Sequence, residues 1–148
     1  MTARFLVVFV LAISAVACTE TKGLPTEFAR ACDPDNEKRV LEISGVLDER
    51  GGVFCSNRGG TMECGFDLLA SANSNKKFTA YIEQGTGPNT MDSLDKGYKR
   101  TDIKIRDKSG NPVDLGSDTV TITGRMNVMG ALPGGQGVCF MQVERIDK

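Results

Sequence analysis

The chain has 148 residues, and its 18 basic and 19 acidic side chains give a formal net charge of −1. This length is sufficient for one domain with a sizeable core, and the balanced charge excludes a general electrostatic attraction for nucleic acid or anionic membranes. The chain has no histidine, which excludes Ser-His and Cys-His nucleophiles and histidine-bound metals, and it has no tryptophan. We therefore expect no metal site, no bound cofactor and no catalytic residues.

Residues 1–17 have the features of a secretory signal peptide. Arg4 supplies a positive charge, residues 5–13 are apolar, and residues 15–17 end in the small side chain that signal peptidase requires. The apolar run is too short to cross a membrane as a mature helix. We therefore expect an exported protein, in a compartment where disulfides can form.

Cys18 directly follows the expected cleavage site. The sequence Ala15-Val16-Ala17-Cys18 resembles the lipobox of bacterial lipoproteins, although that family prefers Leu at the position of Ala15. The resemblance implies that Cys18 carries a lipid and anchors the mature protein to a membrane of the bacterial cell envelope. Plain cleavage after Ala17 is the alternative, and it would give a soluble periplasmic or secreted protein. Removing Cys18 from the five cysteines leaves an even number that can pair fully, which favours lipidation.

Residues 18–37 are expected to form a polar tether followed by an irregular segment. Pro25 could begin a short helix, with Phe28 and Cys32 on one side of it. The turn-forming residues 33–36 then end that helix. We therefore place the start of the folded domain at residue 38 and its end at residue 148.

The first strand of this domain is predicted over residues 39–49. Leu41, Ile43 and Leu47 fall on one face of this strand, as a period of two residues requires. Gly51-Gly52 interrupts the pattern, and residues 53–56 continue it. Because glycines inside a strand often mark a bulge or bend, we expect one long bent strand.

Gly59-Gly60 predicts a two-residue type I′ turn in a β-hairpin. The register that this turn imposes places Cys55 opposite Cys64 in a non-hydrogen-bonded pair. The Cα atoms of such a pair lie about 4.5 Å apart, which is within the range that a disulfide spans. Of the three connectivities open to four cysteines, this one leaves Cys32 to pair with Cys139 by elimination.

The rest of the chain also favours strands. The plainest alternation of apolar and polar residues covers residues 119–128, with Val120, Ile122 and Met126 on one face. Other predicted elements are a strand over residues 77–83, one helical turn over residues 90–94, a strand over 101–106, a glycine-rich connection over 130–137 and a last strand over 138–146.

These segments resemble the OB-fold superfamily. The resemblance rests on residues 40–47 with Gly45 in mid-strand, on residues 116–125, and on residues 138–146. It implies an all-β fold, a small five- to six-stranded OB-like barrel with a short helical linker. The two disulfides predicted above would crosslink this barrel. The strand over residues 101–106 departs from the pattern, and another small β-barrel or a β-sandwich is the alternative.

The OB resemblance implies a binding face on the outside of the second and third strands. That face would carry Glu63, Asp67, Leu69, Lys77, Thr79, Tyr81 and Glu83. Tyr81 is its only aromatic residue, and we expect ligand contacts from Tyr81 with Lys77, Thr79, Leu69 and Asp67. The mixed charge and the single ring do not suit single-stranded nucleic acid. An envelope protein or a glycan fits the face better.

We therefore expect a non-catalytic binding module of the bacterial cell envelope, held to the membrane by its N-terminal lipid. The alternative is an envelope hydrolase that cleaves a glycan with a pair of carboxylates. The sequence alone brings no two particular acids together, which favours the binding module.

Overall fold

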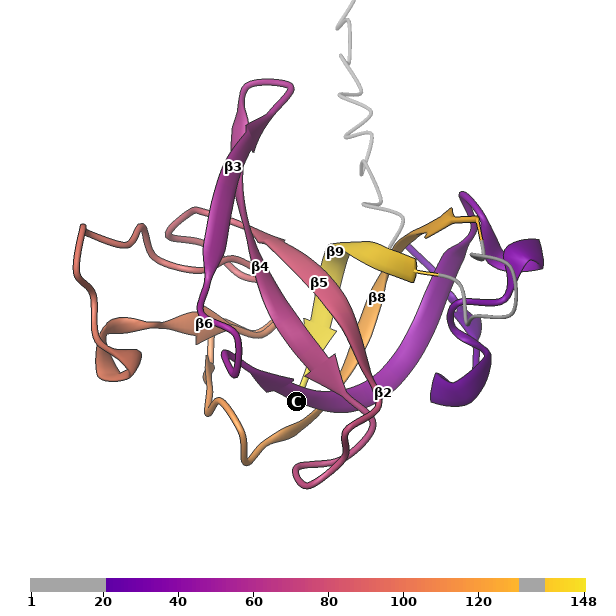
Figure 1. The fold of residues 1–148 in the computed structure, drawn as a ribbon. Coiled ribbons are helices and arrows are strands. Elements are labelled where there is room, and N and C mark those ends of the chain that lie inside the picture. The colour runs from indigo at the N-terminus through magenta and orange to yellow at the C-terminus, as the bar shows by residue number, and fades with distance from the viewer. Residues whose placement is uncertain (1–20, 131–137) are drawn as a thin grey trace, which may run out of the picture.

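The computed structural model describes residues 21–130 and 138–148, in which nine β-strands and three 3₁₀ turns form an all-β fold without an α-helix. The expected all-β class is confirmed, with more strands than the five or six that we predicted. The strands are β1 (Leu24–Pro25), β2 (Val40–Asp48), β3 (Phe54–Arg58), β4 (Thr61–Leu69), β5 (Lys77–Glu83), β6 (Ile105–Arg106), β7 (Pro112–Val113), β8 (Thr119–Met129) and β9 (Val138–Asp147) (Figure 1). The 3₁₀ turns are η1 (Phe28–Arg30), η2 (Pro34–Asn36) and η3 (Arg100–Asp102).

Seven of these strands form one sheet in the order β1-β2-β8-β9-β5-β4-β3. Strand β4 also pairs with the end of β2, from Val46 opposite Leu69 to Asp48 opposite Asp67. The pairings therefore run from β2 through β8, β9, β5 and β4 back to β2. Within this ring only β5 and β9 are parallel. The β3–β4 hairpin projects beyond it (Figure 1), and β6 and β7 pair separately.

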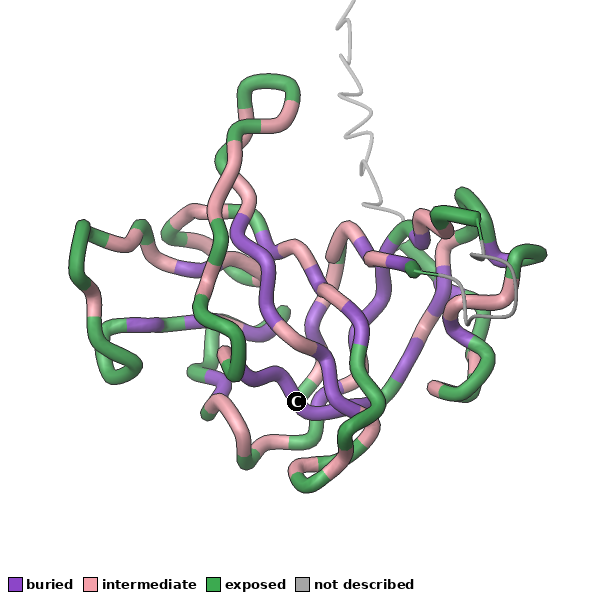
Figure 2. Tube along the Cα trace, in the orientation of Figure 1, coloured by how far each residue is buried: buried purple, intermediate pink, exposed green. Residues whose placement is uncertain are grey.

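Strand β8 has the predicted alternation. Val120, Ile122 and Met126 are buried in the core, and buried residues follow the strands of the ring (Figure 2). Thr123 is also buried, although it lies on the other face of the strand, where it pairs with Glu42 of β2 and Arg145 of β9. The β8–β9 register shifts beside it, with Glu144 as the extra residue on β9. A Cβ at Gly124 would overlap the carbonyl oxygen of Gln142, so the close approach of β9 requires glycine there.

The prediction of one long bent first strand is wrong. Strand β2 ends at Asp48, and β3 begins at Phe54. A turn separates them, in which the Gly52 N–H donates to the Glu49 carbonyl at 2.7 Å and Gly52 has φ of 78°. Strand β3 pairs with β4 alone among the described strands, because this turn carries the chain out of the ring.

The predicted helical linker over residues 90–94 is also wrong. The fully buried Met91 forms isolated β-bridges to Gln84 and Ile105 instead. In the extended conformation the apolar Met91 side chain is removed from water between the two bridged segments. A short helix on the surface would leave more of this side chain exposed. Of the strand predicted over residues 101–106, only β6 at residues 105–106 is present. The 3₁₀ turn η3 occupies the start of the predicted strand.

The predicted hairpin register and both disulfides are confirmed. Gly59 and Gly60 have φ of 60° and 97°, and Cys55 pairs directly with Cys64. The Cys55–Cys64 disulfide joins Cα atoms 4.0 Å apart, and the Cys32–Cys139 disulfide joins Cα atoms 5.4 Å apart. Two disulfides indicate an oxidising compartment outside the cytoplasm.

The segment expected to be irregular contains β1, η1 and η2 in place of a short helix, and it packs on the sheet. Ala31 is fully buried in the core, and the Phe28 ring lies 5.2 Å from that of Phe78. No helix in the described ranges 21–130 and 138–148 is long and apolar enough to span a membrane. The expected signal peptide, Cys18 and residues 131–137 lie outside these ranges.

A buried carboxylate fixes the long connection between β5 and β8. The Asp48 carboxylate accepts hydrogen bonds from Arg100 at 2.7 Å and from Arg50 at 3.0 Å, and Arg100 also donates to the Leu115 carbonyl at 2.8 Å. Burial alone would raise the pKa of Asp48, but the hydrogen bonds from Arg100, from the Glu49 N–H and from Arg50 together hold it below its usual value. The ionised carboxylate therefore stabilises this connection.

We expect the Cys32–Cys139 disulfide to contribute more stability than the Cys55–Cys64 disulfide. The two bonds span 107 and 9 residues in sequence, and the shorter loop is already closed by the hairpin. Replacing both cysteines of the long-range bond by serine should cost about 4 kcal/mol of unfolding free energy, against about 2 kcal/mol for the hairpin bond. Urea unfolding of the two double variants measures the difference, and equal losses would contradict it.

We expect Asp48→Asn to remove part of the acid sensitivity of the fold. A carboxyl whose folded pKa is lowered stabilises the protein above its unfolded pKa, near 3.9, and that stability is lost as the pH falls through the folded pKa. Asp48→Asn should cost about 2 kcal/mol at neutral pH. The difference from the native protein should shrink below about pH 4, as measured by urea unfolding across pH. A difference that does not change with pH would contradict this role.

Candidate functional site

The sheet register brings the outward-facing residues of four strands into rows. Phe54 on β3 pairs with Gly65 on β4, which pairs with Tyr81 on β5, which in turn pairs with Gln142 on β9. Residues that pair in this way share a face of the sheet. In the next row, Asp67 and Thr79 align with Phe140. We call the surface of these two rows, with Arg58, Glu63 and Glu83, the outer face.

Gly65 makes room for the ring of Tyr81. A Cβ at Gly65 would lie 3.1 Å from Cε1 of Tyr81 and 3.0 Å from Cγ2 of Thr79. The ring therefore lies against the backbone of β4, where an added Cβ would push it back by a few tenths of an ångström. Covering a strand glycine with a cross-strand aromatic ring shields the local backbone from water.

A second ring and a guanidinium group complete an aromatic cluster of Arg58, Tyr81 and Phe140. The ring centroids of Tyr81 and Phe140 are 5.5 Å apart, in an edge-to-face arrangement at 88°. The guanidinium carbon of Arg58 lies 4.6 Å from the Tyr81 centroid and 5.0 Å from that of Phe140. These separations allow aromatic and cation–π attraction, which holds the three side chains in one arrangement before any ligand binds.

Two acids adjoin the cluster. Glu63 pairs in register with Glu83, so their side chains leave the sheet on the same side. Glu63 Oε2 lies 3.7 Å from Arg58 Nε, and this oxygen is buried without a hydrogen-bond partner. Arg58 therefore lies between an aromatic surface and a carboxylate.

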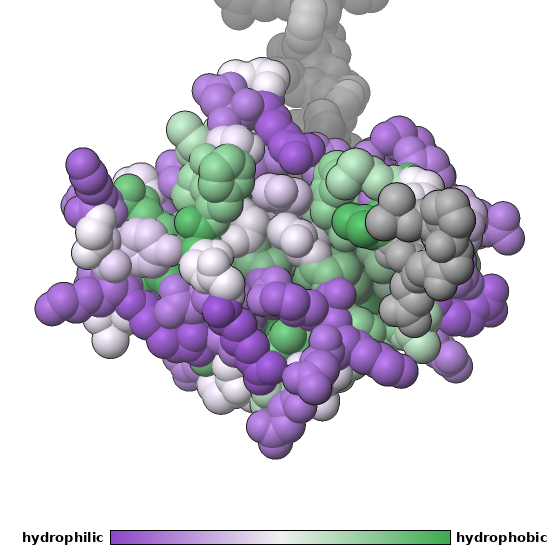
Figure 3. All heavy atoms as spheres, in the orientation of Figure 1, coloured by the Kyte–Doolittle hydropathy of each residue, from purple (hydrophilic) through white to green (hydrophobic). Residues whose placement is uncertain are grey.

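Phe54 is the most exposed large hydrophobic side chain of the described residues. Its relative exposure is 70%, on a strand that pairs along one edge only. Met62 on the same hairpin is also exposed, but it pairs with Asn57 and so lies on the opposite face. The surface over β4 and β5 shows hydrophobic and near-neutral residues across its middle, with hydrophilic residues around it (Figure 3).

The ligand residues expected from the sequence have different environments. Tyr81 and Thr79 are half-buried on the outer face, and exposed Lys77 forms an ion pair with Asp67 at 2.7 Å. The prediction for Leu69 is wrong, because it is fully buried where it pairs with Val46 of β2. Leu69 lies where β4 joins the ring, so it cannot contact a ligand.

Arg58, Phe54 and Phe140 were not expected at this site. Phe140 alternates with the buried residues Cys139 and Met141, so its outward direction was readable from sequence. Its position beside Tyr81 was not, because it depends on the parallel pairing of β5 with β9.

The side chains of the described residues define what chemistry the outer face can offer. In the ranges 21–130 and 138–148, no group of three or more histidine, cysteine, aspartate or glutamate side chains is placed to hold a metal ion. The four cysteines of the folded domain are disulfide-bonded. The outer face offers aromatic rings, a cation and two carboxylates, which can stack, pair and accept hydrogen bonds.

We expect Gly65→Val to displace the Tyr81 ring while leaving the fold intact. The added atoms would occupy the space of the ring edge, whereas valine is otherwise favourable in a strand. Nuclear Overhauser contacts between the Tyr81 and Phe140 rings should disappear in this variant. Gly87→Val is the control, because a Cβ there meets nothing within 4 Å. Unchanged ring contacts in Gly65→Val would contradict the prediction.

The outer face therefore joins two rings, a guanidinium group and two carboxylates in one ordered surface. No family model, curated protein or solved structure matches this chain.

Proposed function

We propose that this chain is a non-catalytic binding module of the bacterial cell envelope, built as an OB-type barrel, that binds a protein partner through the outer face. The ring of pairings through β2, β8, β9, β5 and β4 supports the barrel assignment, since a five-stranded closed or partly open sheet is the OB architecture. The β3–β4 hairpin, β6 and β7 are then additions to that barrel.

The observation that carries the binding proposal is the exposed Phe54 beside the cluster of Arg58, Tyr81 and Phe140. Aromatic and arginine side chains supply most of the energy of protein interfaces. Phe54 offers a ring that is largely in contact with solvent, and the cluster offers side chains already ordered by one another. Because these side chains are ordered in advance, binding loses less conformational entropy.

Export and a lipid anchor complete the proposal. The signal-like residues 1–17, the cysteine that follows them and the parity of the remaining cysteines support it, and so does the oxidising compartment that the two disulfides indicate. The module would then meet its partner at a membrane surface of the envelope.

A glycan hydrolase is the second candidate, and one observation favours it. Glu63 and Glu83 face each other across β4 and β5. Directly opposed residues have Cβ atoms about 5 Å apart, and the two carboxyl groups of retaining glycosidases are separated by a similar distance of about 5 Å. The burial of Glu63 Oε2 beside Arg58 argues against it, because a catalytic carboxyl must be within reach of its substrate. Turnover of an envelope glycan that is lost in Glu83→Gln would favour the hydrolase.

We expect Phe54→Ala and Tyr81→Ala each to weaken partner binding about tenfold or more. The partner is first captured by crosslinking in intact envelopes and identified, and its Kd for each variant is then measured with purified protein. Met62→Ala is the matched control, because it removes an exposed apolar side chain from the same hairpin on the opposite face. Unchanged affinity in both Phe54→Ala and Tyr81→Ala, with the fold intact, would reject the outer face as the site.

A further inference from the structure

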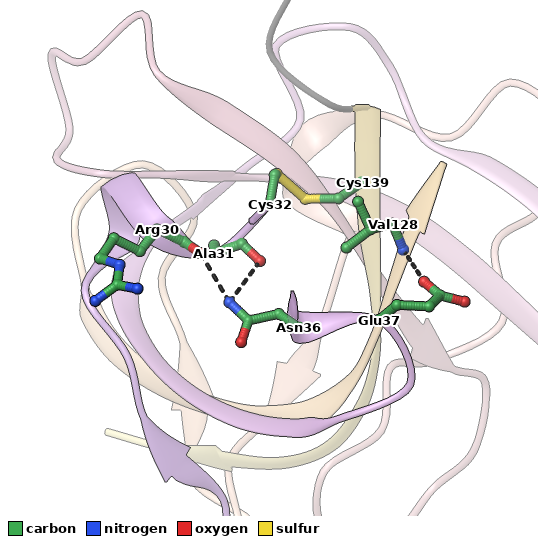
Figure 4. The surroundings of a disulfide bond; sticks show 7 residues. All are labelled: Arg30, Ala31, Cys32, Asn36, Glu37, Val128 and Cys139. Carbon is green, nitrogen blue, oxygen red and sulfur yellow. Dashed lines mark hydrogen bonds between the residues drawn. A yellow bond between two sulfur atoms is a disulfide. The ribbon is translucent and has the colours of Figure 1, made fainter. Parts of the chain in front are cut away.

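The seven-stranded sheet ends in β1 on one side and in β3 on the other, and the edge at β1 is protected. Strand β1 has only two residues, and the second of them, Pro25, has no N–H to offer a further strand. The segment that follows β1 is fixed back onto the domain by the Cys32–Cys139 disulfide and by the hydrogen bond from the Val128 N–H to Glu37 (Figure 4). Short length and proline are common protections against pairing with another chain.

Strand β3 lacks these protections. It has five residues without proline or lysine, and among the described strands it pairs with β4 alone. The β3–β4 hairpin also projects beyond the ring of strands, so its outer edge is accessible (Figure 1). An accessible strand edge of this kind is a template for a further strand. We call it the free edge.

The hairpin register identifies the backbone groups on the free edge. Arg58 and Thr61 flank the two-residue turn and therefore form a hydrogen-bonded pair. Because such pairs alternate along an antiparallel ladder, the N–H and C=O groups of Cys55 and Asn57 point away from β4. No hydrogen-bond partner for these groups lies within the described part of the chain.

The free edge has two defined limits. Val53 is the preceding residue whose backbone points outward, and its N–H donates to the Tyr98 hydroxyl at 2.9 Å. At the other limit, β3 finishes at Arg58, where the turn begins. The free edge therefore runs from Phe54 to Arg58, and its central residue is Ser56.

A second copy of β3 fits the free edge in one antiparallel register, with Ser56 opposite Ser56 of the second copy. Cys55 then pairs with Asn57 of the second copy, so that every outward N–H and C=O of both strands is hydrogen-bonded. This pairing is isologous, as the two-fold symmetry of a closed dimer requires. A register centred on Cys55 would need the Val53 N–H, which is already bonded. A register centred on Asn57 would run into the turn.

The same register makes the side chains of the two copies complementary. Phe54 would lie opposite Arg58 of the second copy, in a non-hydrogen-bonded pair, where side chains approach most closely. The Phe54 residue is 70% exposed in the single chain, and the stem of that arginine would cover its ring. Each Arg58 can keep its guanidinium over Tyr81 and Phe140 of its own copy. The most exposed large hydrophobic side chain of the described residues would thus be removed from water.

We propose that two copies of this chain dimerise through the free edges of β3 and form one continuous sheet centred on Ser56. The dimer goes beyond the proposed function, because it requires neither the lipid anchor nor another protein. Its contact comprises a single short strand from each copy, so the area buried is small and the dimer dissociates readily in dilute solution. The outer faces of the two copies lie side by side in this arrangement.

Ser56→Cys tests the register directly. The two residues on the symmetry axis would have Cα atoms about 4.5 Å apart, which a disulfide can span. Mild oxidation of the full-length variant in intact cells should give a dimer on a non-reducing gel, and peptide mapping should show a bond between the two introduced thiols. Met62→Cys is the matched control, because Met62 is exposed on the same hairpin but lies on β4 and on the opposite face. This control should remain monomeric.

Asn57→Pro, added to Ser56→Cys, tests the backbone pairing. Proline removes an outward N–H that β4 does not use, and two-fold symmetry doubles the loss. The yield of crosslinked dimer should fall about tenfold or more. Asn57→Ala is the matched control, because it also loses the side-chain contact with the Gly60 N–H but keeps its own N–H. Its yield should match that of Ser56→Cys alone.

Peptide mapping of the two native disulfides shows that each variant is folded. With these bonds intact, the absence of a Ser56→Cys dimer overturns the inference. Equal crosslinking of Met62→Cys overturns it as well, since random collision would then explain the dimer, and so does a yield that Asn57→Pro leaves unchanged. A Ser56→Cys thiol captured by a different protein also overturns it, because the free edge would then be a docking site for that protein.

Discussion

Strand β2 has to change partners partway along its length, and the arrangement of the sheet depends on this change. Its first residues pair with β8, its last residues pair with β4, and Val46 takes part in both pairings. At Gly45 a Cβ would lie 2.5 Å from the carbonyl oxygen of Leu69, so β4 can approach β2 only because this residue has no side chain. The pairings of the sheet return to β2 through this contact, which also buries Leu69.

The outer face follows from the same register. Strand β4 pairs with β2 at one end and with β3 at the other, and its register with β5 puts Gly65 opposite Tyr81. The parallel pairing of β5 with β9 then brings Phe140 beside that ring. Arg58 can reach both rings because the tight turn at Gly59 and Gly60 returns β4 alongside β3.

The features predicted correctly from sequence are those fixed by local spacing. The alternation along β5 and β8 reports which side chains are buried, and the glycine pair at the hairpin turn sets the Cys55–Cys64 register. The second disulfide then follows from the number of cysteines. The wrong predictions concern residues whose environment depends on segments distant in sequence. Met91 lies in the core because it forms β-bridges to other segments, and Leu69 is buried because β2 pairs beside it. Two of the three residues of the aromatic cluster were missed, and Phe140 was missed for the same reason, because no spacing within β9 indicates that its neighbour is β5.

The long-range disulfide has a consequence for how the chain matures. Of the four cysteines that pair in the folded domain, a chain that enters an oxidising compartment from its N-terminus exposes Cys32 first and Cys139 last. In the interval, Cys55 and Cys64 are the partners within reach of Cys32. A hairpin forms in microseconds and thiol oxidation takes seconds or longer, so the turn at Gly59 and Gly60 can bring Cys55 to Cys64 before either meets Cys32. Early closure of the hairpin thus keeps Cys55 and Cys64 from pairing with Cys32 before Cys139 is available. A chain whose turn formed more slowly would depend on a disulfide isomerase to correct its disulfides.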